Sequence, residues 1–200
     1  MSHSAAADLL AVLDPLDYPT RSRRLGTETA RLAANPAALD AVLDAFAAGG
    51  AYERELGLKM AMAAHRPDRV IAALHDPLHR VRALALYACV ARPDAAADAA
   101  ILGTVDDASL HWRRTVVRLV GAAKRTDLAD RLAESYRDRL GDADTAKLLP
   151  VCSAKVAERL LPDLAHELRG WSRFGTRHPT LMLDFARREL TAVPSGARAA

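Results

Sequence analysis

Aromatic residues and cysteine are scarce in this 200-residue chain. Phe, Trp and Tyr make up 4% of the sequence, and two cysteines, Cys89 and Cys152, are too few for a disulfide framework. No apolar run approaches the roughly 20 residues that a membrane-spanning helix needs, and the N-terminal segment lacks the basic region of a signal peptide. We therefore expect a cytoplasmic protein, in a compartment that keeps thiols reduced.

Lysine is also rare, because it occurs only at positions 59, 124, 147 and 155 among 28 Lys and Arg residues. The net charge is only +3, so the arginine bias is more typical of a GC-rich coding sequence than of nucleic-acid binding. Arg21, Arg23 and Arg24 lie in the first turn of a predicted helix, where cations oppose the helix dipole. They either face water or are held there for a ligand.

The abundant residues are alanine and leucine, which favour closely packed helices over sheets. Apolar residues recur at helical spacing between Pro and Gly breaks, so we predict an all-α chain of about 10–12 helices. Pro162 should kink or split its helix. The predicted helices cover residues 5–13, 20–34, 36–48, 51–65, 67–74, 77–91, 93–103, 108–124, 127–140, 143–150, 154–169 and 180–192, followed by a disordered tail at 193–200.

Two of these helices share one design. In the segments 76–92 and 107–124, an aspartate precedes by six residues an arginine that falls inside the apolar arc of the helix: Asp76 and Arg82, then Asp107 and Arg113. A buried arginine needs a partner, because an unpaired buried charge is very costly.

The same design recurs with a period near 30 residues. Tyr52, Val81 and Trp112 occupy equivalent places, 29 and 31 residues apart, although Glu53 replaces the inward arginine in the first copy. A similar loop sequence, beginning with arginine, also recurs at 66–68, 92–94 and 125–127. Periods of this length predict stacked helical units.

The pattern D-P-x-x-x-V-R-x-x-A at residues 76–85 resembles the second helix of a HEAT repeat, and Asp107…Arg113 is similar with Trp112 in place of valine. The resemblance implies an α-solenoid of stacked antiparallel helix pairs, with its clearest repeats at 36–125 of a single domain 1–192. The chain also resembles the N-terminal part of longer bacterial HEAT-repeat proteins without an assigned role. In this family aspartate and arginine form a ladder between repeats, which implies as ladder members Asp76, Arg82, Asp107 and Arg113.

A solenoid lines up its second helices, so their outward residues form one extended surface. We therefore expect a non-catalytic scaffold that binds a protein partner through this inner face. Aligned arginines also suit phosphate groups, so nucleic-acid binding stays open as the alternative. The predicted contact residues are Arg54, Arg80, Tyr87, Arg114 and Arg118.

No catalytic, cofactor or metal motif is present, so we expect neither an enzyme nor a cofactor. His75 and His79 are separated by Pro77 at a helix start and do not share a helix face, which argues against a metal pair. The segment WRRTVV at 112–117 is similar to one in DNA glycosylases that remove alkylated bases. Those enzymes have W-x-x-x-D, whereas here Val116 follows Trp112, so this reading is the least favoured alternative.

Overall fold

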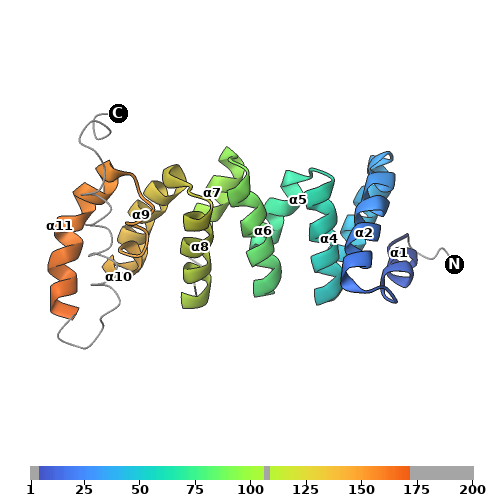
Figure 1. Cartoon of the computed structure of the whole chain (residues 1–200), viewed down its shortest axis with the longest axis horizontal. Helices are drawn as coiled ribbons and strands as arrows, with labels where there is room; N and C mark the ends of the chain where they lie inside the picture. The colour runs from blue at the N-terminus through green and yellow to red at the C-terminus, as the bar shows by residue number, and fades with distance from the viewer. Residues whose placement is uncertain (1–4, 106–108, 172–200) are drawn as a thin grey trace. The chain divides into compact units, whose positions relative to one another are not determined.

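The computed structural model describes residues 5–105 and 109–171, with side chains described as far as residue 164. Within these ranges all regular structure is helical and no strand occurs (Figure 1), which confirms the all-α prediction. The elements are α1 (Ala5–Leu13), α2 (Tyr18–Ala33), α3 (Pro36–Ala47), α4 (Ala51–Ala63), α5 (Pro67–Ala72), the 3-10 helix η1 (Ala73–His75), α6 (His79–Ala91), α7 (Ala95–Gly103), α8 (Leu110–Ala122), α9 (Thr126–Leu140), α10 (Asp142–Thr145) and α11 (Ala154–Trp171).

The chain divides near the end of α6 into two compact units, Met1–Cys89 (unit 1) and Val90–Ala200 (unit 2). The expected single domain over 1–192 stays a prediction. The predicted helix at 180–192 and the predicted tail at 193–200 lie outside the described residues.

In unit 1, α3 and α4 pack side by side, and α2 packs against both. Two helix starts are set by local capping: the Asp17 carboxylate accepts from Thr20 N at 2.9 Å, and the Asn35 side chain accepts from Ala38 N at 3.2 Å. The hydrogen bond from Thr20 lowers the pKa of Asp17. The core of the unit is apolar and nearly solvent-free, and its largest members are Leu13, Leu39, Phe46, Met60, Leu74 and Leu86.

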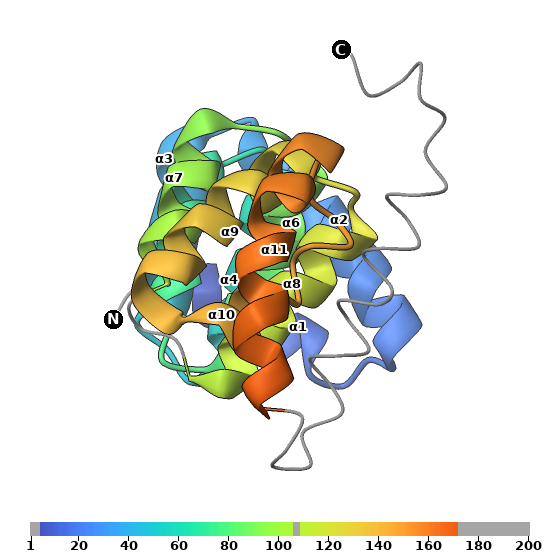
Figure 2. The same cartoon turned by 90° about the vertical axis from the view of Figure 1, so that its left-hand side faces the viewer.

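In unit 2, α9 packs against α7, α8 and α10, and α10 also contacts α11 (Figure 2). The buried aromatic side chains are Trp112 on α8 and Tyr136 on α9. Burial and the nearby Asp144 carboxylate raise the pKa of Tyr136. Ile101, Leu128 and Leu132 complete the centre of this core.

One helix prediction in unit 2 was wrong, and of the two effects predicted for Pro162 the split does not occur. The helix expected at 143–150 shortens to α10, because the following amides of Lys147 and Leu148 bond to carbonyls only three residues earlier. Pro162 does not split its helix, since α11 continues through it from Ala154 to Trp171. The remaining described helices begin and end within a few residues of the predicted ranges.

The two glycines inside α4 and α2 should respond in opposite ways to alanine. A Cβ at Gly57 would lie 2.9 Å from the Phe46 Cβ, whereas a Cβ at Gly26 would meet no atom within 4 Å beyond its chain neighbours and the backbone of its own helix. We expect Gly57→Ala to lower the free energy of unfolding by about 1–3 kcal/mol, because α3 and α4 must separate to make room for the new methyl group. The higher helix propensity of alanine offsets up to about 1 kcal/mol of this loss. Gly26→Ala should gain about 0.5–1 kcal/mol. Urea denaturation measures both, and stabilisation by Gly57→Ala would contradict the close packing of α3 on α4.

Candidate partner-binding face

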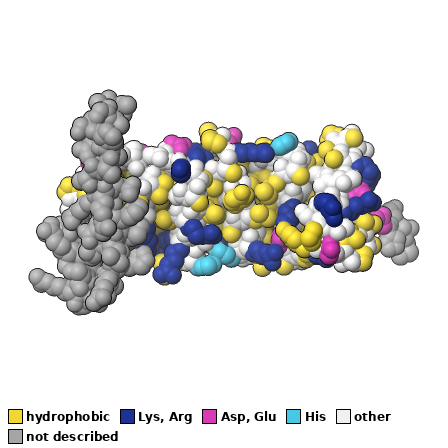
Figure 3. Space-filling view, in the orientation of Figure 1, with side chains coloured by type: hydrophobic (Ala, Val, Ile, Leu, Met, Phe, Trp, Pro, Cys, Tyr) yellow, Lys and Arg dark blue, Asp and Glu magenta, His cyan; other side chains and the backbone are white. Residues whose placement is uncertain are grey.

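A groove of about 510 Å³ crosses unit 1 between α2, α4 and the start of α6. Its floor is apolar, because the buried side chains of Leu25, Leu56 and Val81 line it. Figure 3 shows apolar, basic and acidic side chains intermixed over α2 and α4. The groove therefore combines an apolar base with charged and aromatic walls, which is the composition of many ligand and peptide sites.

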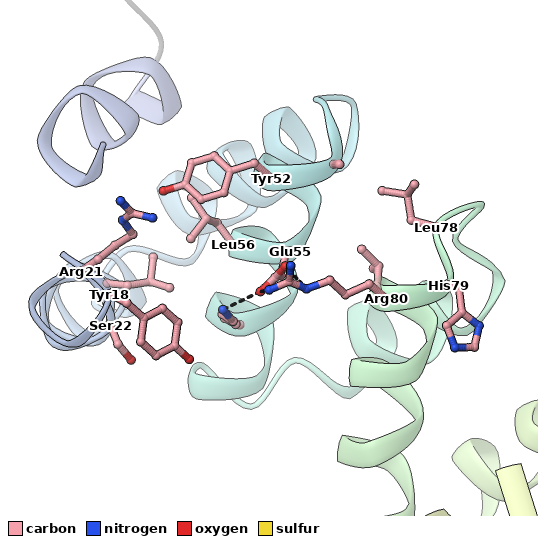
Figure 4. Close-up of a pocket in the computed structure, with 13 residues that line it drawn as sticks. Tyr18, Arg21, Ser22, Tyr52, Glu55, Leu56, Leu78, His79 and Arg80 are labelled. Carbon is pink, nitrogen blue, oxygen red and sulfur yellow. Dashed lines mark hydrogen bonds and ion pairs between the residues drawn. The ribbon is translucent and has the colours of Figure 1, made fainter. Parts of the chain in front are cut away.

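Two tyrosines and two cations form crossed pairs between α2 and α4. Lys59 of α4 lies over the ring of Tyr18 of α2, and Arg21 of α2 lies over the ring of Tyr52 of α4, each at 5.5 Å from the ring centroid. Such cation–π contacts stabilise by about 0.5–1 kcal/mol at exposed sites. Tyr18 is 68% exposed and Tyr52 is 37% exposed, so both phenol groups border the open groove (Figure 4).

Tyr52 differs from the sequence prediction, which placed it with Val81 and Trp112 on the buried arc of its helix. Val81 and Trp112 are buried, but Tyr52 lies at the groove. Its partial burial raises the pKa of its hydroxyl, an effect that Arg21 opposes and the nearby Asp14 carboxylate reinforces. The sequence placed Tyr52 at a core position of its helix. In the structure, Tyr52 lines the groove and contacts Arg21 of α2.

Arg21 of α2 also binds the backbone of the segment that connects α1 to α2. Its guanidinium donates to the backbone carbonyls of Leu13 at 3.1 Å, Leu16 at 2.7 Å and Asp14 at 3.3 Å. These carbonyls lie at and just after the end of α1, where backbone acceptors lack partners within the helix, although the Leu13 carbonyl also accepts from Leu16 N at 3.1 Å. Arg21 therefore does not simply face water: it is half-buried, its guanidinium binds the backbone, and it also lines the groove.

Glu55 is the one carboxylate in the groove lining. It joins Lys59 at 2.7 Å and Arg80 at 2.8 Å, so α4 and the first turn of α6 share an ion-pair network (Figure 4). The Arg80 side chain is 80% exposed and that of Glu55 is only 14% exposed. The guanidinium of Arg80 therefore keeps most of its surface open to solvent.

The predicted contact residues have different environments. Arg80 lines the groove, and Tyr87 is 56% exposed on α6. Arg54 differs from the expectation of an outward anchor, because its side chain is only 23% exposed and its Nε lies 3.2 Å from the Asp76 carboxylate. Arg114 and Arg118 are exposed on the second and third turns of α8.

Arg114 and Arg118 stand apart from the other arginines whose side chains are described. Every other one takes part in a hydrogen bond, an ion pair or another electrostatic contact, but these two take part in none. They are four residues apart on one helix face, where like charges destabilise a helix by about 0.2–0.5 kcal/mol. An external anion is the kind of group that both could bind.

The described residues of the implied ladder differ in what they contact. Arg82 donates to the backbone carbonyls of Asp76 at 2.7 Å and Pro77 at 3.1 Å, while the Asp76 carboxylate faces Arg54 and accepts from Leu78 N at 2.7 Å. Arg113 binds Asp144 of α10. Asp107 lies outside the described residues. In both cases with a carboxylate, an arginine of one helix therefore reaches a carboxylate at or near the start of a later helix.

A second set of arginine–carboxylate pairs was not anticipated from the sequence. It begins at two turns in which His65 and Lys124 have left-handed backbone, with φ of 54° and 52°. In each turn the next amide, that of Arg66 or Arg125, bonds to a carbonyl five residues earlier. This is the hydrogen-bonding pattern of a Schellman motif.

From these turns the two arginines reach back to carboxylates 26 and 27 residues earlier: Arg66 to Asp40 of α3, and Arg125 to Asp98 of α7. The recurring arginine was visible as the repeated loop at 66–68 and 125–127. Its partners were not, because Asp40 and Asp98 resemble any other acidic residue on an amphipathic helix.

The Arg125 pair is the more deeply buried of the two. Its side chain and that of Asp98 are each 8% exposed, against 27% and 35% for Arg66 and Asp40. Hydrogen bonds to Asp127 and then to Asp98 outweigh desolvation and raise the pKa of Arg125. The Arg125 hydrogen bond in turn lowers the pKa of Asp127. A charged guanidinium here is a structural element of unit 2.

The structure places the residues that suggested other chemistry in structural roles. Trp112 is 3% exposed and donates its indole N–H to Thr104 at 3.1 Å, so it does not reach solvent as a base-binding residue would. Cys89 is buried, and desolvation, followed by the nearby Asp130, raises the pKa of the Cys152 thiol to about 12. In the described part of the chain, no three His, Cys, Asp or Glu side chains converge as a metal site requires.

Removing the charge of Arg125 should lower the free energy of unfolding much more than removing that of Arg66. Arg125→Met keeps an apolar stem but leaves Asp98 buried with only Arg131 nearby, at 3.6 Å. We expect it to lose about 3–5 kcal/mol of unfolding free energy. Arg66→Met, at the half-exposed turn, should lose about 0.2–1 kcal/mol. Chemical denaturation of both variants gives the comparison, and equal losses would contradict the difference in burial.

Asp144 should make stability depend on acid pH. Burial acts to raise its pKa, but hydrogen bonds from Lys147 and Arg113 outweigh this and hold the pKa below its ordinary value. Its stabilising contribution is therefore complete above about pH 4 and is lost as the pH falls through the lowered native pKa. At neutral pH, Asp144→Asn should lose about 1–3 kcal/mol of unfolding free energy and therefore melt at a lower temperature than the unchanged protein.

The difference in melting temperature between Asp144→Asn and the unchanged protein should narrow below about pH 4, where the native carboxyl becomes protonated. Asp163→Asn is the matched control, because the Asp163 carboxylate pairs with Arg137 but is 56% exposed. It should change the melting temperature little at any pH. A difference for Asp144→Asn that stays constant into strong acid would refute the role assigned to this carboxylate.

No family model, no curated protein and no solved structure matches this chain. None of the helices described is both long and apolar enough to cross a membrane. The features on which a function can be based are therefore the groove of unit 1 and the unpaired arginines of α8.

Proposed function

We propose that this chain is a non-catalytic HEAT-like α-solenoid scaffold that binds a protein partner through the face of its second helices. The observation that carries the proposal is the groove of unit 1, where exposed tyrosines and cations surround a floor of Leu25, Leu56 and Val81. Tyrosine and arginine around an apolar centre are the residues that dominate protein-binding surfaces.

The ion pairs support the repeat architecture within this proposal. Arg66 and Arg125 each link the first helix of one pair to the start of the next, α3 to α5 and α7 to α9. Arg80 and Glu55, 25 residues apart, link α4 to α6 on the second-helix side. Contacts that recur at nearly constant separation are the pattern of stacked repeats, in which each unit touches its neighbours.

Nucleic-acid binding is the second candidate, and one observation favours it. Arg114 and Arg118 are exposed, lie one turn apart and have no partner among the described residues. Two guanidinium groups at this spacing suit phosphate oxygens as well as carboxylates. The groove favours a protein instead, because its apolar floor offers no contact to a phosphate backbone.

Selection of peptides from a random library with the whole chain as bait tests the proposal. Selected peptides should bind Tyr52→Ala at least about tenfold more weakly than the unchanged chain, since a buried aromatic contact is lost. Val12→Ala, which trims an exposed side chain of α1 outside the groove, should bind as before. Fluorescence anisotropy gives the affinities, and circular dichroism verifies the fold of each variant.

A different result would move the assignment. If no peptide is selected, and the chain instead binds random duplex DNA with an affinity that falls steeply with salt, nucleic acid becomes the ligand class. In that case Arg114→Gln with Arg118→Gln should reduce the salt dependence. Equal binding of selected peptides to the Tyr52→Ala and unchanged chains would show that the groove is not the binding site.

A further inference from the structure

We infer that the segment bound by the groove of unit 1 is acidic and carries an apolar side chain, an inference that rests on the proposed function. The first support is the balance of charge in the lining. Arg21, Lys59 and Arg80 line the groove, against Glu55 as the one carboxylate of the lining. Asp14 lies beside the Tyr52 hydroxyl but does not line the groove.

The cations are not equally neutralised by the fold. Arg21 binds neutral backbone carbonyls and a tyrosine ring, and the Asp17 carboxylate acts on it through a coulombic interaction, the weakest of the causes that shift the pKa of Asp17. Lys59 and Arg80 share the single carboxylate of Glu55. The lining therefore keeps an excess of positive charge, which attracts an acidic segment and repels a basic one.

Arg80 is the cation best placed to contact the ligand. Its side chain is 80% exposed although it is paired with Glu55, and Figure 4 shows it reaching from α6 toward α4 across the groove. A guanidinium presents five N–H donors in a planar fork, so it can bind Glu55 and still donate to a second carboxylate. A carboxylate of the ligand held at this point would bring neighbouring side chains over the apolar floor.

The tyrosines favour a peptide over a single-stranded nucleic acid. Base stacking needs an open aromatic face, and one face of each ring is already covered, that of Tyr18 by Lys59 and that of Tyr52 by Arg21. With one face of each ring given to a cation, the open ring surface and the hydroxyl groups suit apolar side chains and peptide carbonyls. Leu25 and Leu56 then provide the surface on which an apolar side chain of the ligand packs.

Three labelled peptides of equal length test the inference on the whole chain. They share the same phenylalanine and glycine positions, and their remaining positions are all glutamate, all glutamine or all lysine. By fluorescence anisotropy the glutamate peptide should bind about tenfold more tightly than the glutamine peptide, and the lysine peptide should bind least. Equal affinities, or tighter binding of the lysine peptide, would overturn the inference.

Two variants with opposite expected effects locate the preference in the groove. Arg80→Gln should reduce the advantage of the glutamate peptide to less than about threefold, and Glu55→Gln should increase it, because the one lining carboxylate is removed. Arg24→Gln is the matched control, since it removes one positive charge from α2 at a residue outside the groove that pairs with Glu28. If Arg24→Gln lowers the advantage as much as Arg80→Gln, the attraction is long-range and the inference fails.

The failure of this inference is distinguishable from failure of the proposed function. If the glutamate and glutamine peptides bind equally well and Tyr52→Ala weakens both, the groove binds protein segments without a preference for acid. If none of the three peptides binds but library-selected peptides do, and Tyr52→Ala weakens them, the groove binds protein; selected peptides without an excess of acidic residues then refute the acidic preference. If neither set binds, both proposals fall together.

Discussion

An arginine that reaches a carboxylate about one helix pair away is the interaction on which the described structure depends. Arg125 and Asp98 are the clearest case, because both side chains are nearly excluded from solvent and each neutralises the other. Burial of an ion pair adds little net stability compared with apolar packing, but removing one partner is very costly. The pair therefore selects one register between α7 and α9, since any other alignment would leave a charge buried alone.

The same constraint explains the turns that carry these arginines. His65 and Lys124 adopt left-handed backbone although neither is glycine, a conformation that costs free energy for residues with a Cβ. The hydrogen bonds of the Schellman motif and the arginine–carboxylate pair that follows offset this cost. Alanine-rich helices have few large side chains with which to specify their packing, so directional pairs fix what apolar contacts leave open.

The groove arises from the same arrangement of helices. Arg21 donates hydrogen bonds to backbone carbonyls at and after the end of α1, and the ion pair of Glu55 with Arg80 links α4 to α6. These residues of the groove lining are therefore held in place by contacts that also stabilise the fold. The two tyrosines are each oriented by a cation from the neighbouring helix. Side chains fixed before binding lose less conformational entropy when a ligand arrives, which favours a protein-binding role for this surface.

Much of the local structure followed from the sequence. The predicted ranges 36–48 and 51–65 agree with α3 and α4 to within two residues, whereas the capping side chain of Asp17 starts α2 at Tyr18, two residues before the predicted start at residue 20. The predictions failed where local pattern and tertiary position disagree. Residues 146–150 have the apolar spacing of a helix but form tighter turns. Arg54 was predicted to face solvent from its helix, but its side chain is largely covered and pairs with Asp76.

The sequence by itself determined the all-helical class, the approximate ends of most described helices and the recurrence of arginine at equivalent turns. These properties depend on residues near one another in the chain, through capping, helical periodicity and backbone breaks. Only the tertiary structure decided which carboxylate each arginine binds and that Tyr18 and Tyr52 face one groove with Arg21 and Lys59. Those pairings join residues far apart in sequence, and helix packing alone sets the distance between them.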